Sequence, residues 1–252
     1  MSEWERHSAW WIAGFTAGAD VEYAEQIVPL VEAGVAGSSR VLDVGCGEGQ
    51  LARLAATGGA FAVGIDGAWN QLAVARVRGG GPSYARSLAT ELPFREAAFD
   101  AAIGCLVFEH LDDLTAAASE IGRVLETGGR LHCVLNHPLT QTPGSGLVED
   151  LGVDPPERYW RVGRYLVETD GVERVDHDVE LRFVHRPLFR YVNAFADAGL
   201  VVERMVEPWP PGDVADSASA TPADASFAAA VPRLLYLRLR REERVSSLRP
   251  DG

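Results

Sequence analysis

The middle of the chain alternates between short apolar runs and longer segments with apolar residues at helical spacing. The apolar runs predict buried strands at residues 41–44, 61–66, 83–88, 99–106 and 130–136. The segments between them predict helices at residues 51–56, 71–77 and 111–125. Strands that alternate with helices over this length predict an α/β fold with a doubly wound, Rossmann-like, mostly parallel sheet.

Segments on either side of this core predict further elements. Before it, Asp20 is placed to cap a helix over residues 21–33, within an aromatic-rich amino-terminal flap. After it, Pro187 begins a helix that Gly199 ends. The last two strands, which bring the predicted sheet to seven, cover residues 200–207 and 233–241.

These elements divide the chain into four parts. They are an amino-terminal helical flap (1–38), a core (39–138), a cap inserted after the fifth strand (139–186), and the carboxyl-terminal helix with the last two strands (187–241). The cap segment is longer than a strand-to-helix link requires, and loops of this length in a compact domain are usually functional. Residues 212–226 have low complexity and are expected to be mobile.

A glycine-rich turn follows the first predicted strand in the segment Arg40–Gln50, RVLDVGCGEGQ. Gly45, Gly47 and Gly49 have G-x-G-x-G spacing, and glycine lets a backbone turn tightly and approach a ligand. A loop in this position lies at the carboxyl edge of a parallel sheet, where α/β folds bind ligands. The loop is one residue shorter than the dinucleotide form, and Asp43 precedes it. This pattern suits a ligand with a cationic amine and no pyrophosphate, such as S-adenosylmethionine (SAM).

A second carboxylate ends the second predicted strand. Asp66 follows Asp43 by 23 positions. This is close to the roughly 20-residue spacing at which an acid meets ribose hydroxyls in nucleotide-binding folds. Because a carboxylate accepts two parallel hydrogen bonds from a vicinal diol, Asp66 is predicted to bind a ribose.

Charge and cysteine content narrow the class of partner. The chain has 23 basic and 36 acidic residues, a formal net charge of −13, which argues against nucleic acid or an anionic membrane. Its three cysteines form no CxxC pair, so we expect reduced intracellular thiols and no metal site. No signal-peptide pattern and no membrane-length apolar run is visible, so we expect a cytoplasmic protein without membrane insertion.

Four motifs in order resemble the class I SAM-dependent methyltransferases, specifically the methyltransferase type 11 family. They are VLDVGCGEG (41–49), the strand end at Asp66, ELPF with FDAAI (91–94 and 99–103), and IGRVLETGGRL (121–131). The resemblance covers about residues 40–136, and the ordered combination is more specific than any single motif. It implies SAM as cofactor, S-adenosylhomocysteine (SAH) as product, and an antiparallel final strand.

The resemblance also implies a set of cofactor-binding residues. They are Asp43, Gly45, Cys46, Gly47, Asp66, Gly67, Leu88, Ala89, Leu106 and His110. Leu88 and Ala89 would lie beside the adenine, and Leu106 with His110 near the sulfonium. The family often has an acidic residue at the position of Leu88, so the adenine amino group would be bound here by backbone or by another side chain.

Residues of the flap, the fifth strand and the cap are candidates for the acceptor side. The catalytic candidates are His137 and Tyr23, where His137 would act as base for a hydroxyl or as donor to a carboxylate. The substrate-binding candidates are Gln26, Trp11, Phe15, Asn136, Trp160 and Tyr165. Each of these side chains also has a plain structural interpretation as part of a packed core. Together the aromatic residues suit a hydrophobic small molecule, because they offer an apolar enclosure with few charges.

The sequence therefore predicts methyl transfer from SAM to an apolar small molecule. O-methylation of a fatty or aromatic carboxylate is favoured, because an acceptor that is already ionised needs only to be held. O-methylation of a hydroxylated or quinol-like ring is the alternative. Two hypotheses of other classes are an NAD(P)-binding oxidoreductase, which the short loop disfavours, and a non-catalytic SAM-binding protein with a blocked acceptor pocket. The oligomeric state is left open.

Overall fold

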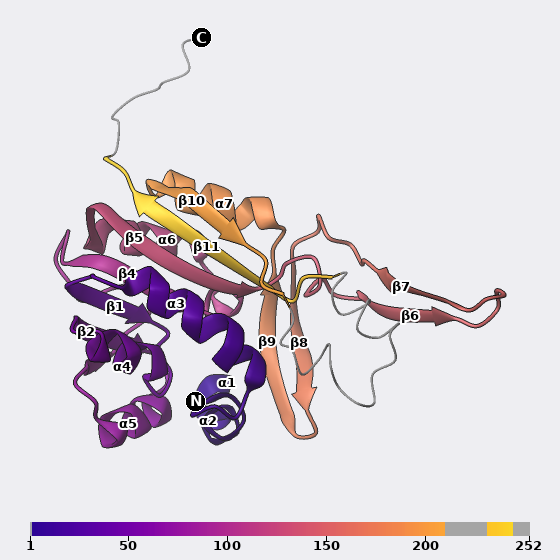
Figure 1. The fold of residues 1–252 in the computed structure, drawn as a ribbon, viewed down its shortest axis with the longest axis horizontal. Coiled ribbons are helices and arrows are strands. Elements are labelled where there is room, and N and C mark those ends of the chain that lie inside the picture. Colours follow the sequence, from indigo (N-terminus) through magenta and orange to yellow (C-terminus); the bar gives the residue numbers. More distant parts are fainter. Residues whose placement is uncertain (1, 210–230, 244–252) are drawn as a thin grey trace, which may run out of the picture.

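A seven-stranded sheet forms the centre of the protein, which is known from a computed structural model that describes residues 2–209 and 231–243. The strands lie in the order β10-β11-β5-β4-β1-β2-β3 (Figure 1). They are β1 (Arg40–Val44), β2 (Phe61–Asp66), β3 (Ser83–Arg86), β4 (Phe99–Cys105), β5 (Leu125–Asn136), β10 (Leu200–Val206) and β11 (Leu234–Arg241). Strands β1 to β5 pair in parallel, whereas β11 is antiparallel to both β5 and β10. The predicted sheet is therefore confirmed; the low-complexity segment 212–226 lies outside the described residues.

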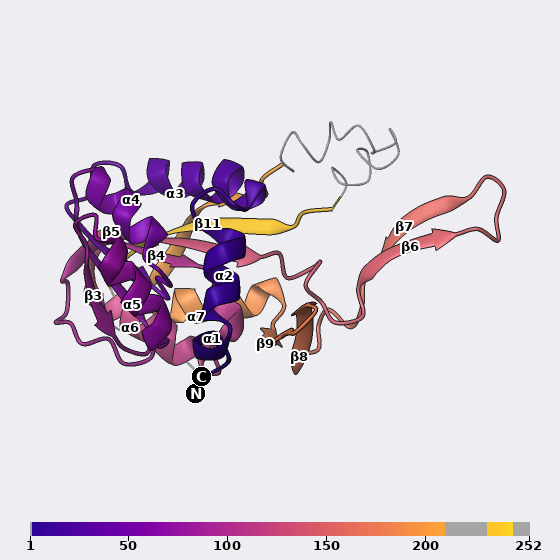
Figure 2. The ribbon, with the colours of Figure 1, turned by 90° about the horizontal axis from the view of Figure 1, so that it is seen from below.

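Helices cover both faces of the sheet, as the predicted doubly wound fold requires (Figures 1 and 2). The helices that follow strands are α4 (Gln50–Thr57), α5 (Trp69–Arg78), α6 (Leu114–Val124) and α7 (Leu188–Asp197). Adjacent residues of β1 point to opposite faces, so Leu42 packs in the cluster with α6 and α7, and Val41 in the cluster with α4. Among the described residues, no helix has the length and apolar content to cross a membrane.

The amino-terminal flap is helical as predicted, and its last helix contains a π-helical turn that the sequence did not indicate. It begins with α1 (Glu3–Arg6) and α2 (Ser8–Phe15). The helix predicted over residues 21–33 is confirmed as a continuous helical run from residue 21 to residue 35, but it contains a π-helical turn, η1 (Tyr23–Ile27), before α3 (Val28–Val35). Pro29 has no N–H to donate to the preceding turn, which interrupts the regular ladder at this junction. The cap is as predicted: the Tyr23 amide donates to the Asp20 carboxylate at 2.5 Å.

Three other element boundaries differ from the prediction. The predicted third strand ends at Arg86, two residues early, because only residues 83–86 pair with β2. The helix predicted over residues 111–125 begins three residues later, as α6, because Asp113 caps its first turn. A 3-10 turn, η2 (Phe108–His110), precedes it. Helix α6 passes directly into β5, which therefore begins at Leu125 rather than at residue 130.

The inserted segment 139–186 contains two β-hairpins. The strands are β6 (Gly146–Asp150) paired with β7 (Glu157–Arg161), and β8 (Thr169–Asp176) paired with β9 (Val179–His185). The β8–β9 hairpin lies beside the flap, whereas the β6–β7 hairpin extends away from the sheet (Figure 2). The role of this segment as a cap over the acceptor stays a prediction.

A buried polar pair lies within the apolar layer between the sheet and α3. His132 of β5 has its Nδ1 2.8 Å from the hydroxyl of Tyr236 on β11. Gly34 packs directly on this histidine, because a Cβ at Gly34 would lie 2.4 Å from the His132 Nδ1. Burial, with smaller contributions from Arg238 and Arg130, lowers the pKa of His132 to about 4.

This pKa predicts a loss of stability in acid. The unfolded chain takes up the proton near pH 6.5, whereas the folded protein resists it until about pH 4. The contribution of neutral His132 to the free energy of unfolding is therefore complete above pH 6.5 and is lost as the pH falls toward 4. We expect urea denaturation to show that the free energy of unfolding falls between pH 7 and pH 4.5 by about 2 kcal/mol more in wild type than in His132→Gln. An equal loss in both proteins would contradict this account.

Candidate active site

The glycine loop between β1 and α4 folds back onto the end of β2. The amides of Gly45 and Cys46 both donate to the Ile65 carbonyl, each at 2.9 Å. Gly45 has a φ of +71°, and a Cβ there would lie 2.5 Å from the Val107 side chain. Glycine is thus required at this position both by the backbone conformation and by the close approach of the turn after β4.

The predicted ribose-binding acid, Asp66, connects this loop to the start of α5. One of its oxygens accepts the Gly47 amide at 2.9 Å and the other accepts the Ala68 amide at 2.7 Å. Burial raises the pKa of Asp66, and these two hydrogen bonds oppose the rise. Each carboxylate oxygen has a second lone pair, so both can still accept hydrogen bonds from a ribose diol.

Asp43 is a buried carboxylate at the end of β1. Its Oδ2 has no hydrogen-bond partner among the described residues. Burial raises the pKa of Asp43 to about 7; a backbone hydrogen bond from Ala52 opposes the rise, and the charges of Asp66 and Glu48 add to it. A buried carboxylate with a free oxygen is suited to a cationic ligand, such as the amine of SAM.

Residues of the predicted adenine side meet at the ends of β2 and β3. A Cβ on Gly67 would lie 3.7 Å from the Leu88 side chain, which is 61% exposed, while Ala89 is buried. At the end of β4, Leu106 has a φ of +51°, a left-handed conformation that is rare for leucine. Such strain clusters at functional sites, and here it falls beside the glycine loop.

Aromatic residues of the flap cover the glycine loop. Trp11 and Phe15 stack with ring centroids 4.4 Å apart, and Trp11 Nε1 lies 3.8 Å from where a Cβ of Gly47 would be. Trp4 meets Trp11 edge-on at 5.5 Å and His110 at 4.8 Å. A continuous row of rings therefore runs from the cofactor loop to His110.

His110 is held in one orientation by the inserted hairpin. Its Nδ1 lies 2.8 Å from the backbone carbonyl of Arg182, and its ring lies 4.5 Å from that of Phe183. A carbonyl oxygen can only accept, so Nδ1 carries the hydrogen and Nε2 retains its lone pair. No described residue forms a hydrogen bond with Nε2.

The two residues predicted to be catalytic have structural roles here. The Leu139 amide donates to Nδ1 of His137 at 3.2 Å, and Nε2 lies 3.0 Å from the Glu207 carboxylate. With both nitrogens engaged, and with burial lowering its pKa, His137 has no free lone pair for a base. Tyr23 is buried beside Cys105, and burial raises its pKa well above the ordinary value, so its hydroxyl retains its proton.

The predicted substrate-binding residues are dispersed, because several of them hold the fold together. Gln26 donates to the Trp209 carbonyl at 2.5 Å, and Asn136 donates to the Glu109 carboxylate at 3.0 Å. Tyr165 accepts the Leu188 amide at 2.9 Å and so caps α7. Trp160 belongs to β7, in the hairpin that extends away from the sheet (Figure 2). Of the six candidates, only Trp11 and Phe15 lie in the aromatic row.

Sequence reasoning missed four residues of this region: Trp4, Glu5, Glu109 and Arg182. Of these four, only Glu109 is adjacent in sequence to a predicted site residue, His110. It is buried, and its Oε2 has no partner among the described residues. The contacts of the other three join segments far apart in sequence, and no local pattern marks them.

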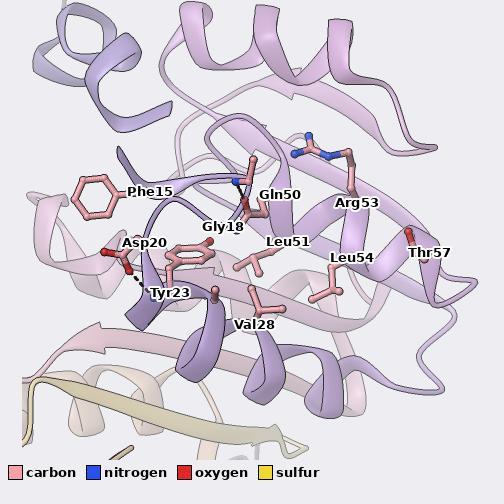
Figure 3. A pocket seen from close by; sticks show the side chains of 12 residues that line it. Phe15, Gly18, Asp20, Tyr23, Val28, Gln50, Leu51, Arg53, Leu54 and Thr57 are labelled. Carbon is pink, nitrogen blue, oxygen red and sulfur yellow. Dashed lines mark hydrogen bonds between the residues drawn. The ribbon is translucent and has the colours of Figure 1, made fainter. Parts of the chain in front are cut away.

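A cavity of about 320 Å³ lies between the flap, η1 and α4. In Figure 3, Phe15 and Tyr23 line it opposite Leu51 and Leu54 of α4. Asp20 and Arg53 add charge at its margin, but most of the lining is apolar. It adjoins the aromatic row through Phe15.

These features define a class of protein. A doubly wound sheet with an antiparallel last strand, a short glycine loop and acids at the ends of β1 and β2 is the arrangement of a SAM-dependent methyltransferase. Asp43 and Asp66 fit the amine and the ribose of that cofactor, and the bare backbone of the loop permits its close approach.

Comparisons with known proteins agree with this assignment to the SAM-dependent methyltransferases. A family model described as "Methyltransferase domain" matches residues 42–133. The O-methyltransferase resE of Aspergillus sclerotiorum is 37% identical over 157 residues, which are 54% of this chain and 60% of that protein. The methyltransferase sll0829 of Synechocystis sp. is 30% identical over 146 residues, 57% of this chain and 67% of that protein. A SAM-dependent methyltransferase from Mesorhizobium loti has a crystal structure with a TM-score of 0.70 and 28% identity, covering 84% of this chain and 96% of that one.

The chain belongs to the class I SAM-dependent methyltransferases, in the methyltransferase type 11 family, and SAM is the cofactor of this family. The match to resE spans less than two thirds of that protein's length.

Removal of the Asp66 carboxylate tests the cofactor site. We expect Asp66→Ala to weaken SAH binding at least tenfold in calorimetric titration, because both the loop and the ribose lose an acceptor. Asp100→Ala is a matched control, since Asp100 also accepts two backbone amides, those of Ser39 and Arg40, at the opposite edge of the sheet. If both variants weaken SAH binding equally, Asp66 has only a structural role.

The raised pKa of Asp43 predicts that cofactor binding depends on pH. A cationic amine binds the ionised carboxylate, and Asp43 becomes protonated as the pH falls below about 7. We therefore expect SAH affinity to fall between pH 8 and pH 6 in wild type, and to be weak and nearly independent of pH in Asp43→Asn. A pH dependence that persists in the variant would assign it to another group.

Proposed function

We propose that this chain transfers a methyl group from SAM to a hydroxyl oxygen of an apolar small molecule, with His110 as general base. The observation that carries this proposal is the orientation of His110, whose Nδ1–H donates to the Arg182 carbonyl and leaves Nε2 as an acceptor. A hydroxyl must lose its proton when its oxygen attacks, whereas a carboxylate has none to lose. The presence of a base held in one tautomer therefore favours a hydroxylated ring as the methyl acceptor. The sequence alone had favoured a carboxylate.

The chain's own residues would contribute binding, orientation and proton transfer. SAM supplies a methyl group on a cationic sulfonium, which reacts by in-line displacement. Asp43 and Asp66 would hold the amine and the ribose, and the glycine loop would fix the cofactor against the end of β1. His110 would take the acceptor proton at Nε2 as the oxygen–methyl bond forms.

The apolar character of the acceptor rests on the walls of the site. Trp4, Trp11 and Phe183 surround the region between the glycine loop and His110, and the adjoining cavity has a mostly apolar lining. Such walls exclude water from the reacting oxygen and bind a hydrophobic ring. The relative resE is named an O-methyltransferase, which makes oxygen the first atom to test. A cytoplasmic location stays a prediction.

An acceptor panel tests the proposal. Purified protein would be incubated with SAM and hydroxylated aromatic rings, aromatic and fatty acids, or aromatic amines, and SAH formation would be measured. We expect turnover with the hydroxylated rings. Preference for the acids would support the carboxylate alternative, and turnover with amines alone would reject O-methylation.

Replacement of His110 tests the base. We expect His110→Gln to lower kcat with a hydroxylated acceptor by about 100-fold, the usual size of a general-base contribution, with little change in SAH affinity. His137→Gln serves as the matched control, because His137 is also near the sheet edge but has both nitrogens engaged. Similar losses of kcat in the two variants would contradict the assignment of His110.

A further inference from the structure

Helix α1 places three consecutive side chains on three different parts of the protein. The Glu3 carboxylate accepts the Arg182 amide of β9 at 2.8 Å. The Trp4 ring contacts the His110 ring edge-on at 4.8 Å. The Glu5 carboxylate accepts amides at the start of α5 from residues 69 and 70, at 2.6 and 3.0 Å. We call residues 3–5 the clasp, because they join β9, η2 and α5.

Arg182 connects the clasp to the proposed base. Its amide donates to Glu3, and its carbonyl accepts from Nδ1 of His110. Its guanidinium forms ion pairs with Asp170 of β8 and with Asp112, just after the turn that contains His110. Arg182 thus contacts the clasp through its amide and the proposed base through its carbonyl. Displacement of Glu3 would therefore move the carbonyl that orients His110.

The opposite end of the clasp lies on the cofactor side. Glu5 caps the start of α5, and α5 begins just after Asp66, the predicted ribose ligand. Farther along the flap, Trp10 donates its indole N–H to Asp176 at the tip of the β8–β9 hairpin, at 2.8 Å. The flap therefore bridges the cofactor side and the hairpin that orients His110.

We infer that the clasp positions the base: Trp4 and Glu3 hold His110 in its Nδ1–H tautomer. The inference rests on the proposed role of His110. Trp4 acts directly on the imidazole ring, and Glu3 acts through the backbone of Arg182. Without the clasp, the His110 ring loses an aromatic neighbour and the strand that supplies its carbonyl partner loses an anchor, so the ring is no longer restricted to one tautomer.

The tautomer of His110 can be measured without any acceptor. In histidine-¹⁵N-labelled protein with SAH bound, ring nitrogen shifts at pH 8.5, above the usual titration range of histidine, distinguish the two neutral forms. The His110 signals are assigned by their loss in His110→Gln. We expect one Nδ1–H tautomer in wild type and in Trp4→Phe, and a mixture in Trp4→Ala and Glu3→Ala. Glu32→Ala, an exposed glutamate on α3, is the matched control for Glu3 and should resemble wild type.

Kinetics give a second readout. We expect Trp4→Ala and Glu3→Ala to lower kcat roughly tenfold or more at saturating SAM, with partial rescue in Trp4→Phe, because misorientation of a base slows the chemical step. Glu5→Ala should instead raise the Kd for SAH, since it frees the cofactor side of the clasp.

The two proposals fail in different ways. An unchanged His110 tautomer in both Trp4→Ala and Glu3→Ala, with folding verified by thermal denaturation, would overturn the clasp inference whatever the activity. A tautomer shift in these variants, in a protein whose wild type methylates no hydroxyl, would support the clasp and reject the proposed function.

Discussion

The hydrogen bonds that tie the glycine loop to the end of β2 are the constraint on which the site depends. The Ile65 carbonyl and the Asp66 carboxylate together accept three amides of a loop that has no regular secondary structure. The same carboxylate accepts the Ala68 amide and so fixes where α5 begins. Because α5 is also where Glu5 attaches, one half-buried acid aligns the glycine loop, the next helix and the flap.

The surroundings of His110, where we propose that the acceptor binds, are assembled from segments that are distant in sequence. The buried guanidinium of Arg186, at the end of the inserted segment, donates to the carbonyls of Phe108, Leu111 and Asp112. These three carbonyls surround the turn that contains His110. The insertion therefore fixes the turn that contains His110, in addition to flanking it with β8 and β9. A methyltransferase core without this segment would lack both the turn geometry and the carbonyl that orients the histidine.

The sequence predicted the parts of the site whose causes are local. Gly45 and Asp66 could be predicted to lie together because a strand, a tight turn and a helix follow one another within a few residues, and the structure does bring them together; their roles toward the cofactor stay predictions. His137 was misjudged because its partner, Glu207, is 70 residues away. Tyr165 was misjudged for a similar reason, since the helix end that it caps begins 23 residues later. The orientation of His110 requires strand β9 to lie against η2, a packing that no spacing indicates.

The β6–β7 hairpin has a practical consequence for handling this protein. Residues 151–159, which include its turn, are all exposed, and the hairpin extends away from the sheet edge where the site lies (Figure 2). Exposed loop tips of this kind tolerate insertions and are preferred points of proteolytic cleavage. A fluorophore or a surface tether attached at this turn would leave the candidate site unobstructed and give the enzyme a defined orientation on a support.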